Sequence, residues 1–436
     1  MFKTLVGAFK NKDIRKKIIY TLLILVVVRV GSLLPIPGVD TNYFSSLLSG
    51  INTGDLSYLS AFTFERMSLF ALSITPYITS SIIMQLLTIA IPKLEEMQKE
   101  GEDGRKKIAS ITRYVTIGLS LIESIAMAVG FGRSGLIKDS AQLSTLHYVV
   151  CIIVVVAALT AGSAVLMWLG ERITEKGVGN GISIVLLINI ISGMPSDFAT
   201  LYSTFVAPKT PAKGVLAAVI ILAILIVMVV LVCFLQDGER RIPVQYSQKV
   251  SGRRTVGGQS TNIPLKVNTA GVMPIIFASS LMQFPVIIAQ LFGKSYEWTR
   301  YLSSSYWCRV EAPKYSIGLL VYIVLLIIFA YFYTSITFNP IEVADNLKKA
   351  GGVIPGITPG KSTSEYLNKI LNYIVFIGAV GLLIIALIPI MCTGFFNASV
   401  SFGGTSIIII VGVVLETLKQ IESQMCNRYY KGFLSE

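Results

Sequence analysis

The chain contains ten apolar stretches, and each approaches the length that a helix needs to cross a lipid bilayer. A transmembrane helix requires about 17 to 25 residues. The stretches are too uniformly apolar for the alternating strands of a lipid-facing barrel, so we expect helices. They lie at 18–34, 68–91, 108–131, 147–168, 178–193, 214–235, 268–291, 315–336, 371–391 and 404–424.

The composition agrees with a membrane protein that crosses the bilayer several times. Hydrophobic residues make up 53% of the 436 residues and charged residues only 14%, whereas soluble domains contain about 25% charged residues. The apolar content excludes a disordered or collagen-like chain, and five cysteines in this length form no disulfide framework.

The basic residues predict the orientation of the chain in the membrane. Ten spans place both termini on one side. The loops and termini on that side, together with Lys419 near the C-terminal end of the last span, contain 26 of the 37 lysines and arginines. Because basic residues in short loops are retained in the cytoplasm, we expect both termini to be cytoplasmic.

Topology alone explains most of the net charge of +13, so a nucleic-acid partner is not needed to account for it. The basic cytoplasmic segment 236–267 is different, because it is longer than a connection between two helices requires. It indicates a docking site for an acidic partner such as a ribosome or a motor protein. Its basic residues are Arg240, Arg241, Lys249, Arg253, Arg254 and Lys266.

The two halves of the chain show a weak internal repeat. Residues 74–87 align without gaps on 272–285, with five identities, and residues 180–186 align on 403–409, with three. These segments belong to the second and fifth spans of each half. An odd number of spans in each half would invert one repeat relative to the other.

The repeated spans present branched apolar faces. Ile74 and Ile78 lie four residues apart, as do Leu186 and Ile190, so each pair shares one face of a helix. A pathway for ions or solutes normally keeps polar or ionisable groups at mid-depth. Ordinary helix packing explains any single isoleucine, but the repeat relates Ile78 to Ile276 and Leu186 to Ile409.

Six segments resemble the SecY family, whose members form the channel of the bacterial protein translocase. The similarity extends through nearly the whole chain, and the loop motifs are more specific than the hydropathy pattern. The segments are ERMSLFALSITPYITSSIIMQLL (65–87), GVGNGISI (177–184), ERRIPVQY (239–246), GGQSTNIPLKVNTAGVMPIIFASS (257–280), FNPIEVADNLKKAGGVIPGITPG (338–360) and YYKGF (429–433).

This resemblance implies an all-α fold of ten transmembrane helices in two inverted five-helix halves, 1–212 and 213–436, which close as a clamshell around a pore. Unfolded polypeptides would cross through the pore, and hydrophobic segments would leave it sideways into the lipid. A ring of aliphatic side chains would close around any passing sequence and resist ions. By analogy the ring consists of Ile74, Ile78, Leu186, Ile190, Ile276 and Ile409.

The resemblance also implies a plug and a lateral gate. The plug is a re-entrant helix within segment 54–65, and its residues would be Asp55, Leu56, Leu59 and Phe62. The gate would form where the second and third spans meet the seventh and eighth. Weak hydrogen bonds across such a seam can break and re-form easily. The gate residues would be Thr79, Ser80, Gln85, Ser279 and Ser280.

The family implies several partners. They are SecE, SecG, the motor ATPase SecA, the ribosome, preproteins with signal peptides and the lipid of the bacterial plasma membrane. Docking would use loops 236–267 and 337–370, with Arg240, Arg241, Arg253 and Arg254 in the first. In the second loop, Thr358 stands where the family usually has an arginine linked to motor-dependent export, and Lys361 is a possible substitute.

An enzyme is not expected. Gly360-Lys361-Ser362 imitates the end of a phosphate-binding loop, but Pro355 stands where that loop needs a glycine. One histidine and scattered cysteines predict no metal site, and no cofactor is expected. The alternative function is a secondary transporter that uses the intramembrane carboxylates Glu123 and Glu416 for proton coupling.

Overall fold

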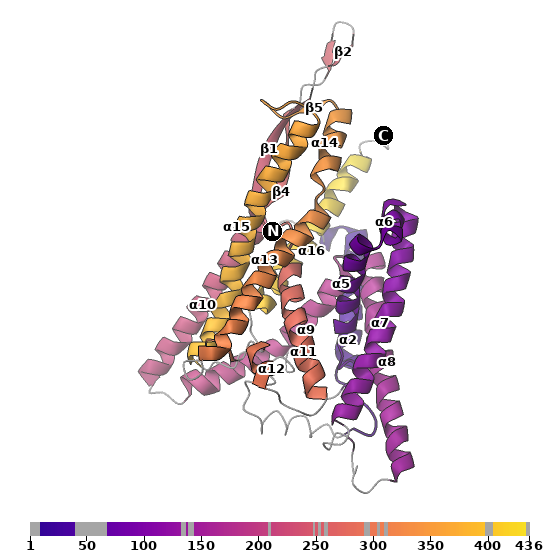
Figure 1. Ribbon diagram of the computed structural model, residues 1–436, viewed down its shortest axis with the longest axis vertical. Helices are drawn as coiled ribbons and strands as arrows, with labels where there is room; N and C mark the ends of the chain where they lie inside the picture. Colours follow the sequence, from indigo (N-terminus) through magenta and orange to yellow (C-terminus); the bar gives the residue numbers. More distant parts are fainter. Residues whose placement is uncertain are drawn as a thin grey trace.

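The protein is mostly helical in a computed structural model, and each of the ten apolar stretches contains a long helix (Figure 1). These helices are α2 (Lys12–Gly31), α5 (Thr75–Ala90), α7 (Glu102–Phe131), α8 (Thr145–Lys176), α9 (Gly181–Leu201), α10 (Pro211–Asp237), α11 (Met273–Leu291), α13 (Ile317–Thr337), α15 (Lys361–Phe396) and α16 (Gly404–Gly432). The structure describes residues 9–39, 68–131, 137, 144–207, 211–246, 249–251, 254–256, 260–291, 297–302, 306–308, 313–396 and 404–432.

Five of the described helices are long and apolar enough to cross a membrane by themselves: α7, α8, α10, α13 and α15. A sixth span results if α5 is joined to the short helix α6 (Pro92–Lys99), although the two are bent by 105°. The apolar parts of α9 and α11 are shorter than a full span. In α2, three lysines and an arginine occupy the first two turns and lower the apolar content.

Shorter elements connect these helices. They are the π-helix η3 (Tyr202–Val206), α12 (Glu297–Leu302), the 3₁₀-helix η5 (Pro313–Ser316), α14 (Pro340–Lys349) and the strands β1 (Glu239–Tyr246), β2 (Lys249–Ser251), β3 (Arg254–Val256), β4 (Ser260–Lys266) and β5 (Gly352–Val353).

The helices form two groups. Figure 1 shows α5, α7 and α8 side by side at one edge of the molecule, and α10, α13 and α15 at the other. The largest buried cluster of the second group includes Val232, Leu326 and Leu382. The first group has its own cluster around Leu159. Contacts join the groups at two seams beyond the connection of η3 to α10: α9 contacts α16, and α7 contacts α11.

In the described part of the chain, the strands lie in the basic segment 236–267 and, as β5, in loop 337–370. Strand β1 pairs antiparallel with β4 on one side and with β5 on the other, and β2 pairs with β3. In β1, the buried Ile242 and Val244 alternate with exposed residues, as expected for a strand with one face covered. This alternation was readable in the motif ERRIPVQY, whose period of two is incompatible with a helix face.

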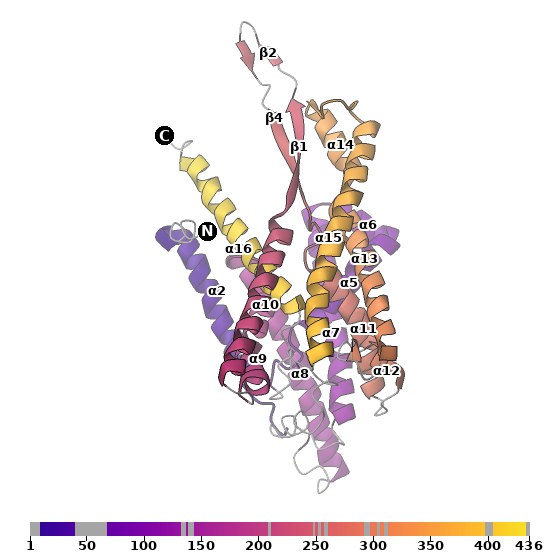
Figure 2. The ribbon, with the colours of Figure 1, turned by 90° about the vertical axis from the view of Figure 1, so that its left-hand side faces the viewer.

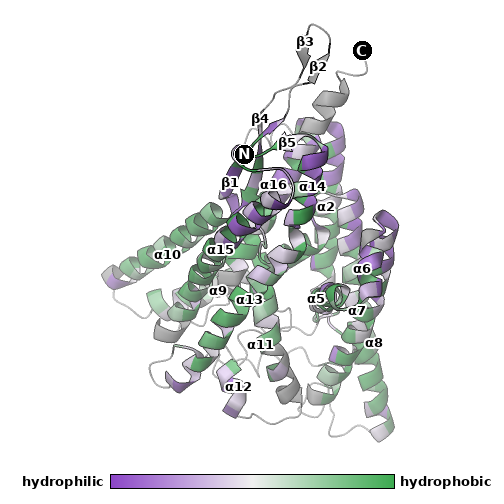
Figure 3. Cartoon of the chain, turned by 45° about the horizontal axis from the view of Figure 1, so that its top comes forward, coloured by the Kyte–Doolittle hydropathy of each residue, from purple (hydrophilic) through white to green (hydrophobic). Residues whose placement is uncertain are grey.

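Polar residues gather at the end of the molecule that contains the sheet. Figure 3 shows hydrophilic residues on α6 and α14, whereas α8, α10 and α13 are hydrophobic over most of their length. The start of α2 and the end of α16 meet at this end, because Lys17 Nζ donates to Gln424 Oε1 at 3.2 Å. Lys419 of α16 also pairs with Asp237 at the end of α10, at 2.7 Å. Figure 2 shows from the side that the start of α2, the end of α16, the strands and α14 lie at the same end of the molecule.

Candidate functional site

Two turns immediately before α5 and α11 are built alike. Residues 69–74 and 267–272 form turns, and the helices begin directly after them at Thr75 and Met273. The interval of 198 residues between the two helix starts equals the offset of the repeat found in the sequence. Each helix has a proline as its second residue, Pro76 or Pro274, a position where the missing N–H is not needed.

Each turn is bonded to the end of the first helix of its own half. Leu69 N donates to Leu34 O just after α2, at 2.9 Å, and Val267 N donates to Gly238 O just after α10, at 2.8 Å. Leu69 and Val267 are repeat partners. The hydrogen bonds therefore relate α2 to α10, the first long helices of the two halves.

A glycine of the fourth long helix in each half packs against the same turn. A Cβ added to Gly162 of α8 would lie 1.9 Å from Leu69 O, and one added to Gly378 of α15 would lie 2.4 Å from Val267 O. Neither position has room for a side chain. The close approach fixes the depth of the turn between the helices, and it pairs α8 with α15 in the repeat.

The second repeated segment also begins equivalent helices. Helix α9 begins at Gly181 and α16 at Gly404, an interval of 223 residues that matches the alignment of 180–186 on 403–409. In α9, the side chain of Asn180 accepts a hydrogen bond from Ile182 N at 3.2 Å and caps the helix. These two helices contact each other across the halves.

Four of the six expected ring residues lie in one apolar cluster, here called the waist. Ile74, only 1% exposed, belongs to its buried core, and Ile78, Leu186 and Ile409 pack against that core half-buried. Side chains from α5, α9 and α16 therefore meet at the seam between the halves. Ile190 and Ile276 are half-buried and lie outside this cluster.

The neighbours of the waist are apolar as well. Ile184 and Val185 of α9 and Val413 of α16 are buried in the same cluster. A water-filled pathway for ions would need polar groups at this depth, so the waist is suited to sealing and not to coordination.

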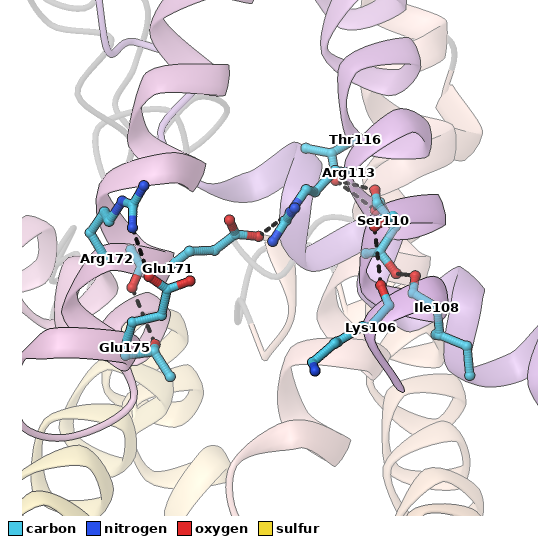
Figure 4. A network of polar contacts seen from close by, with 12 residues as sticks. Lys106, Ile108, Ser110, Arg113, Thr116, Glu171, Arg172 and Glu175 are labelled. Carbon is cyan, nitrogen blue, oxygen red and sulfur yellow. Dashed lines mark hydrogen bonds and ion pairs between the residues drawn. The ribbon is translucent and has the colours of Figure 1, made fainter. Parts of the chain in front are cut away.

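Among the expected gate residues, Ser80 is bonded inside the first half. Its Oγ lies 2.9 Å from Thr112 O and 2.7 Å from Thr116 Oγ1, so it ties α5 to α7. Helix α7 is also tied to α8, because Arg113 Nε donates to Glu171 Oε1 at 2.7 Å (Figure 4). The contact of α7 with α11 then lies at the boundary between the halves.

The other expected gate residues keep their hydroxyls within their own helices or lack a partner. Thr79 Oγ1 donates to Thr75 O at 3.1 Å, and Ser279 Oγ donates to Ile275 O. Gln85 Oε1 is buried without a hydrogen-bond partner, and Ser280 is half-buried. A buried carbonyl oxygen without a hydrogen-bond partner lowers the stability of the folded state, so it readily accepts a hydrogen bond from a donor that comes within reach.

The two basic loops form one structure, here called the platform, that consists of β1, β4, β5, α14 and the start of α15. Ile242, Val244, Leu347 and Leu367 are buried together in it. Arg240 and Arg241 are exposed on β1, and Arg241 is paired with Glu239 at 2.6 Å. Thr358 and Lys361 are exposed between β5 and α15.

Some expected residues cannot be assessed. Arg254 belongs to β3, but its side chain is not described, and Arg253 lies outside the described residues. The expected plug segment 54–65, with Asp55, Leu56, Leu59 and Phe62, also lies outside them. In the part of the chain that the structure describes, no group of three His, Cys, Asp or Glu residues gathers.

The arrangement of helices matches solved protein-conducting channels. A structure described as a protein-conducting channel has a TM-score of 0.61 and 17% identity and covers 94% of this chain and 92% of its own. Sec61 in a canine ribosome-channel complex gives a TM-score of 0.58 at 17% identity, with the same coverage. The fold is therefore that of the SecY/Sec61 class of helical membrane channels.

Sequence comparison identifies the family. The SecY family model matches residues 68–418. The protein translocase subunits SecY of Streptomyces galbus and Bacillus subtilis are 43% and 40% identical to this chain. Both alignments cover 100% of this chain and 100% of the relative. The chain belongs to the SecY family.

We predict that Gly162→Ala destabilises the protein. The new methyl group meets the backbone oxygen of Leu69, which cannot move aside as a flexible side chain would. Overpacking of this kind costs about 1 to 3 kcal/mol. Thermal unfolding of the purified protein in detergent should show a lower apparent melting temperature.

Gly118→Ala on α7 is the matched control for this prediction. A Cβ at Gly118 meets nothing within 4 Å, so the substitution should be neutral or slightly stabilising, because alanine favours a helix interior. Equal melting temperatures for the two variants would contradict the close approach of α8 to the turn.

Proposed function

We propose that the chain forms a channel through which unfolded polypeptides cross the bacterial plasma membrane. The observation that supports this most directly is the waist, where Ile74, Ile78 and Leu186 of the first half meet Ile409 of the second. Aliphatic side chains offer no fixed polar partner. They therefore close around any sequence and present a dry barrier to ions when no chain is present.

The proposed architecture is a clamshell of ten spans in two inverted halves, 1–212 and 213–436. Three repeat-related features support it: the helix starts 198 residues apart, the bonds of Leu69 and Val267, and the glycines Gly162 and Gly378. Ile190 and Ile276 complete the ring of six in this proposal. Their place outside the resting cluster is compatible with a ring that tightens around a chain in transit.

Hydrophobic segments leave the channel between α7 and α11. Ser80 and Arg113 tie α7 to its own half, so the α7–α11 contact can separate without disrupting either half. Gln85, with its unpaired carbonyl, and Thr79, Ser279 and Ser280 lie on the helices beside this seam. Segment 54–65 is the proposed plug on the outer side.

Energy and cargo come from partners, and the chain itself performs no covalent chemistry. The platform, with exposed Arg240 and Arg241, is the proposed docking surface for the ribosome and for SecA. Relatives of similar fold include Sec61 and the yeast Ssh1 complex, each solved with a ribosome. SecE and SecG are the proposed accessory subunits, and preproteins with signal peptides are the cargo.

Both termini are proposed to be cytoplasmic. The start of α2, the end of α16 and the platform lie at one end of the molecule, as the Lys17–Gln424 and Lys419–Asp237 contacts require. This end contains most of the basic residues, which supports its assignment to the cytoplasm.

The first test of the channel is a crosslink from the waist to a passing chain. Ile78→Cys, in vesicles with a stalled and partly translocated preprotein, should form an adduct because Ile78 packs in the waist. The lipid-facing Ile122→Cys on α7, which is 62% exposed, is the control and should form far fewer adducts. A secondary transporter predicts no adduct and instead a saturable solute flux that Glu123→Gln or Glu416→Gln abolishes.

The second test concerns the unusual Thr358. This residue is exposed, so an arginine fits without a clash, and we predict that Thr358→Arg leaves SecA-driven export unchanged or improves it. If Lys361 supplies the missing charge, Lys361→Gln should lower export several-fold. Lys369→Gln removes the same charge two turns further along α15 and should leave export near its normal rate.

Export is measured as the fraction of a labelled preprotein protected from protease inside vesicles. A clear loss of export in Thr358→Arg, or equal losses in the two lysine variants, would contradict a charge-specific role for this turn.

A further inference from the structure

The turn before α5 contains a serine in a conformation that favours glycine. Ser73 has φ +52°, in the left-handed region, and it is one of two non-glycine residues with positive φ among those described. Its repeat partner in the second half is Gly271, with φ +63°. The turn therefore has the same shape in both halves, but only the second half uses the residue that adopts this shape without strain.

A hydrogen bond from α9 accompanies the strained serine. Asn189 Nδ2 donates to Ser73 Oγ at 2.8 Å, and Ser73 is only 4% exposed. The repeat partner of Asn189 on α16 is Gly412, at the interval of 223 residues that relates α9 to α16. The second half therefore has glycine at both positions, and the first half has a bonded pair, here called the clasp.

The second half packs closely at the corresponding place. A Cβ added to Gly412 would lie 3.4 Å from Gln236 Nε2 and 3.6 Å from Val272 Cγ1, so α16 passes close to its turn and leaves little more than the space of a methyl group there. Glycine has no side chain that could donate a hydrogen bond. The two halves thus hold their turns by different means.

The clasp lies next to the waist on both of its helices. Ser73 directly precedes Ile74, and Asn189 lies between Leu186 and Ile190. Ile74 and Leu186 belong to the waist cluster. A bond between Ser73 and Asn189 therefore sets how the apolar faces of α5 and α9 lie relative to each other.

The same turn is held from two further sides. Leu69 O abuts Gly162 of α8, and a Cβ at Gly31 of α2 would lie 2.0 Å from the ring of Phe70. With the clasp as the third contact, from α9, the turn is fixed to three helices of the first half. The first-half wall of the waist would then move as one body, with the motion of opening taken up where α9 meets α16.

We propose that Ser73 and Asn189 are positioning residues that hold the first-half wall of the waist in its sealed arrangement. The proposal rests on the channel function proposed above. Without the bond, the turn that precedes α5 is no longer tied to α9, and Ile74 loses its fixed position relative to Leu186. A resting channel that lacks the clasp should leak small ions.

The test measures iodide entry into vesicles that contain the full chain with its channel partners and no translocating substrate. Ser73→Gly removes the acceptor but suits the turn better than serine, so it should fold normally. Asn189→Ala removes the donor. Each should raise the leak at least about threefold, and the double variant should leak no more than the leakier single variant, because one bond is lost in all three.

Thr88→Ala is the matched control. It removes a buried hydroxyl from the same helix α5, where Thr88 Oγ1 donates to Met84 O at 2.7 Å, away from the turn. Its leak should stay at the unmodified rate. The proposal is overturned if Ser73→Gly and Asn189→Ala remain tight, if their effects add in the double variant, or if Thr88→Ala leaks equally.

The same vesicles separate this proposal from the channel function. If Ile78→Cys forms adducts but Ser73→Gly and Asn189→Ala do not raise the iodide leak, only the proposed role of the clasp is overturned. If Ile78→Cys forms no adducts in a protein without other substitutions, the channel function is overturned, and the proposed role of the clasp is overturned with it.

Discussion

The arrangement of this protein depends on two short turns that interrupt the chain just before α5 and α11. Each turn donates a backbone hydrogen bond to the end of the first helix of its half, and each is pressed against a glycine of the fourth. Within a membrane, non-helical backbone is tolerated only where protein covers its polar groups. The glycines Gly162 and Gly378 permit that cover, and α5 and α11 can therefore each begin directly after their turn.

The waist follows from this constraint. Because α5 begins only after its turn, Ile74 directly precedes α5 and Ile78 lies in its first turn, and both belong to one apolar cluster with side chains of α2, α8, α9 and α16. The cluster joins helices from both halves through apolar side chains. Such contacts have no directional requirement, so they can separate and re-form without leaving unsatisfied polar groups. Directional bonds such as Ser80–Thr116 and Arg113–Glu171 lie within one half.

Much of the fold was readable in the sequence, because hydropathy and the repeat both report on helices. The ungapped alignment of 74–87 on 272–285 even anticipated two equivalent helix starts. The short apolar segment of α9 was foreseen, because the stretch 178–193 is itself short and flanked by glycine. The bent α5–α6 pair and the short apolar segment of α11 were not foreseen, since hydropathy measures composition and not the direction of the chain. The bonds of Leu69 and Val267 were hidden as well, because backbone hydrogen bonds leave no side-chain signature.

The sequence predicted the apolar residues of the candidate site better than its backbone conformation or its sheet. Helix spacing and repeat symmetry singled out the apolar positions because both depend on side-chain type, and four of the six share one cluster. That the six form a ring stays a prediction. The positive φ of Ser73 was not predicted, although its alignment with Gly271 is a signal that could have raised the question. Nor could the sequence show that loops 236–267 and 337–370 share a sheet, because β1 and β5 are separated by more than a hundred residues.

The platform and the waist are parts of one continuous chain, and this continuity makes a route for external work to reach the channel. Strand β4 ends at Lys266, and the turn before α11 starts at the next residue, Val267. Val267 is bonded to Gly238, which directly follows α10 and precedes β1. A displacement of the sheet by a bound partner must therefore move this turn relative to Gly378 or carry α10 and α15 with it. In either case the displacement reaches α11, the helix of the second half that contacts α7 across the seam.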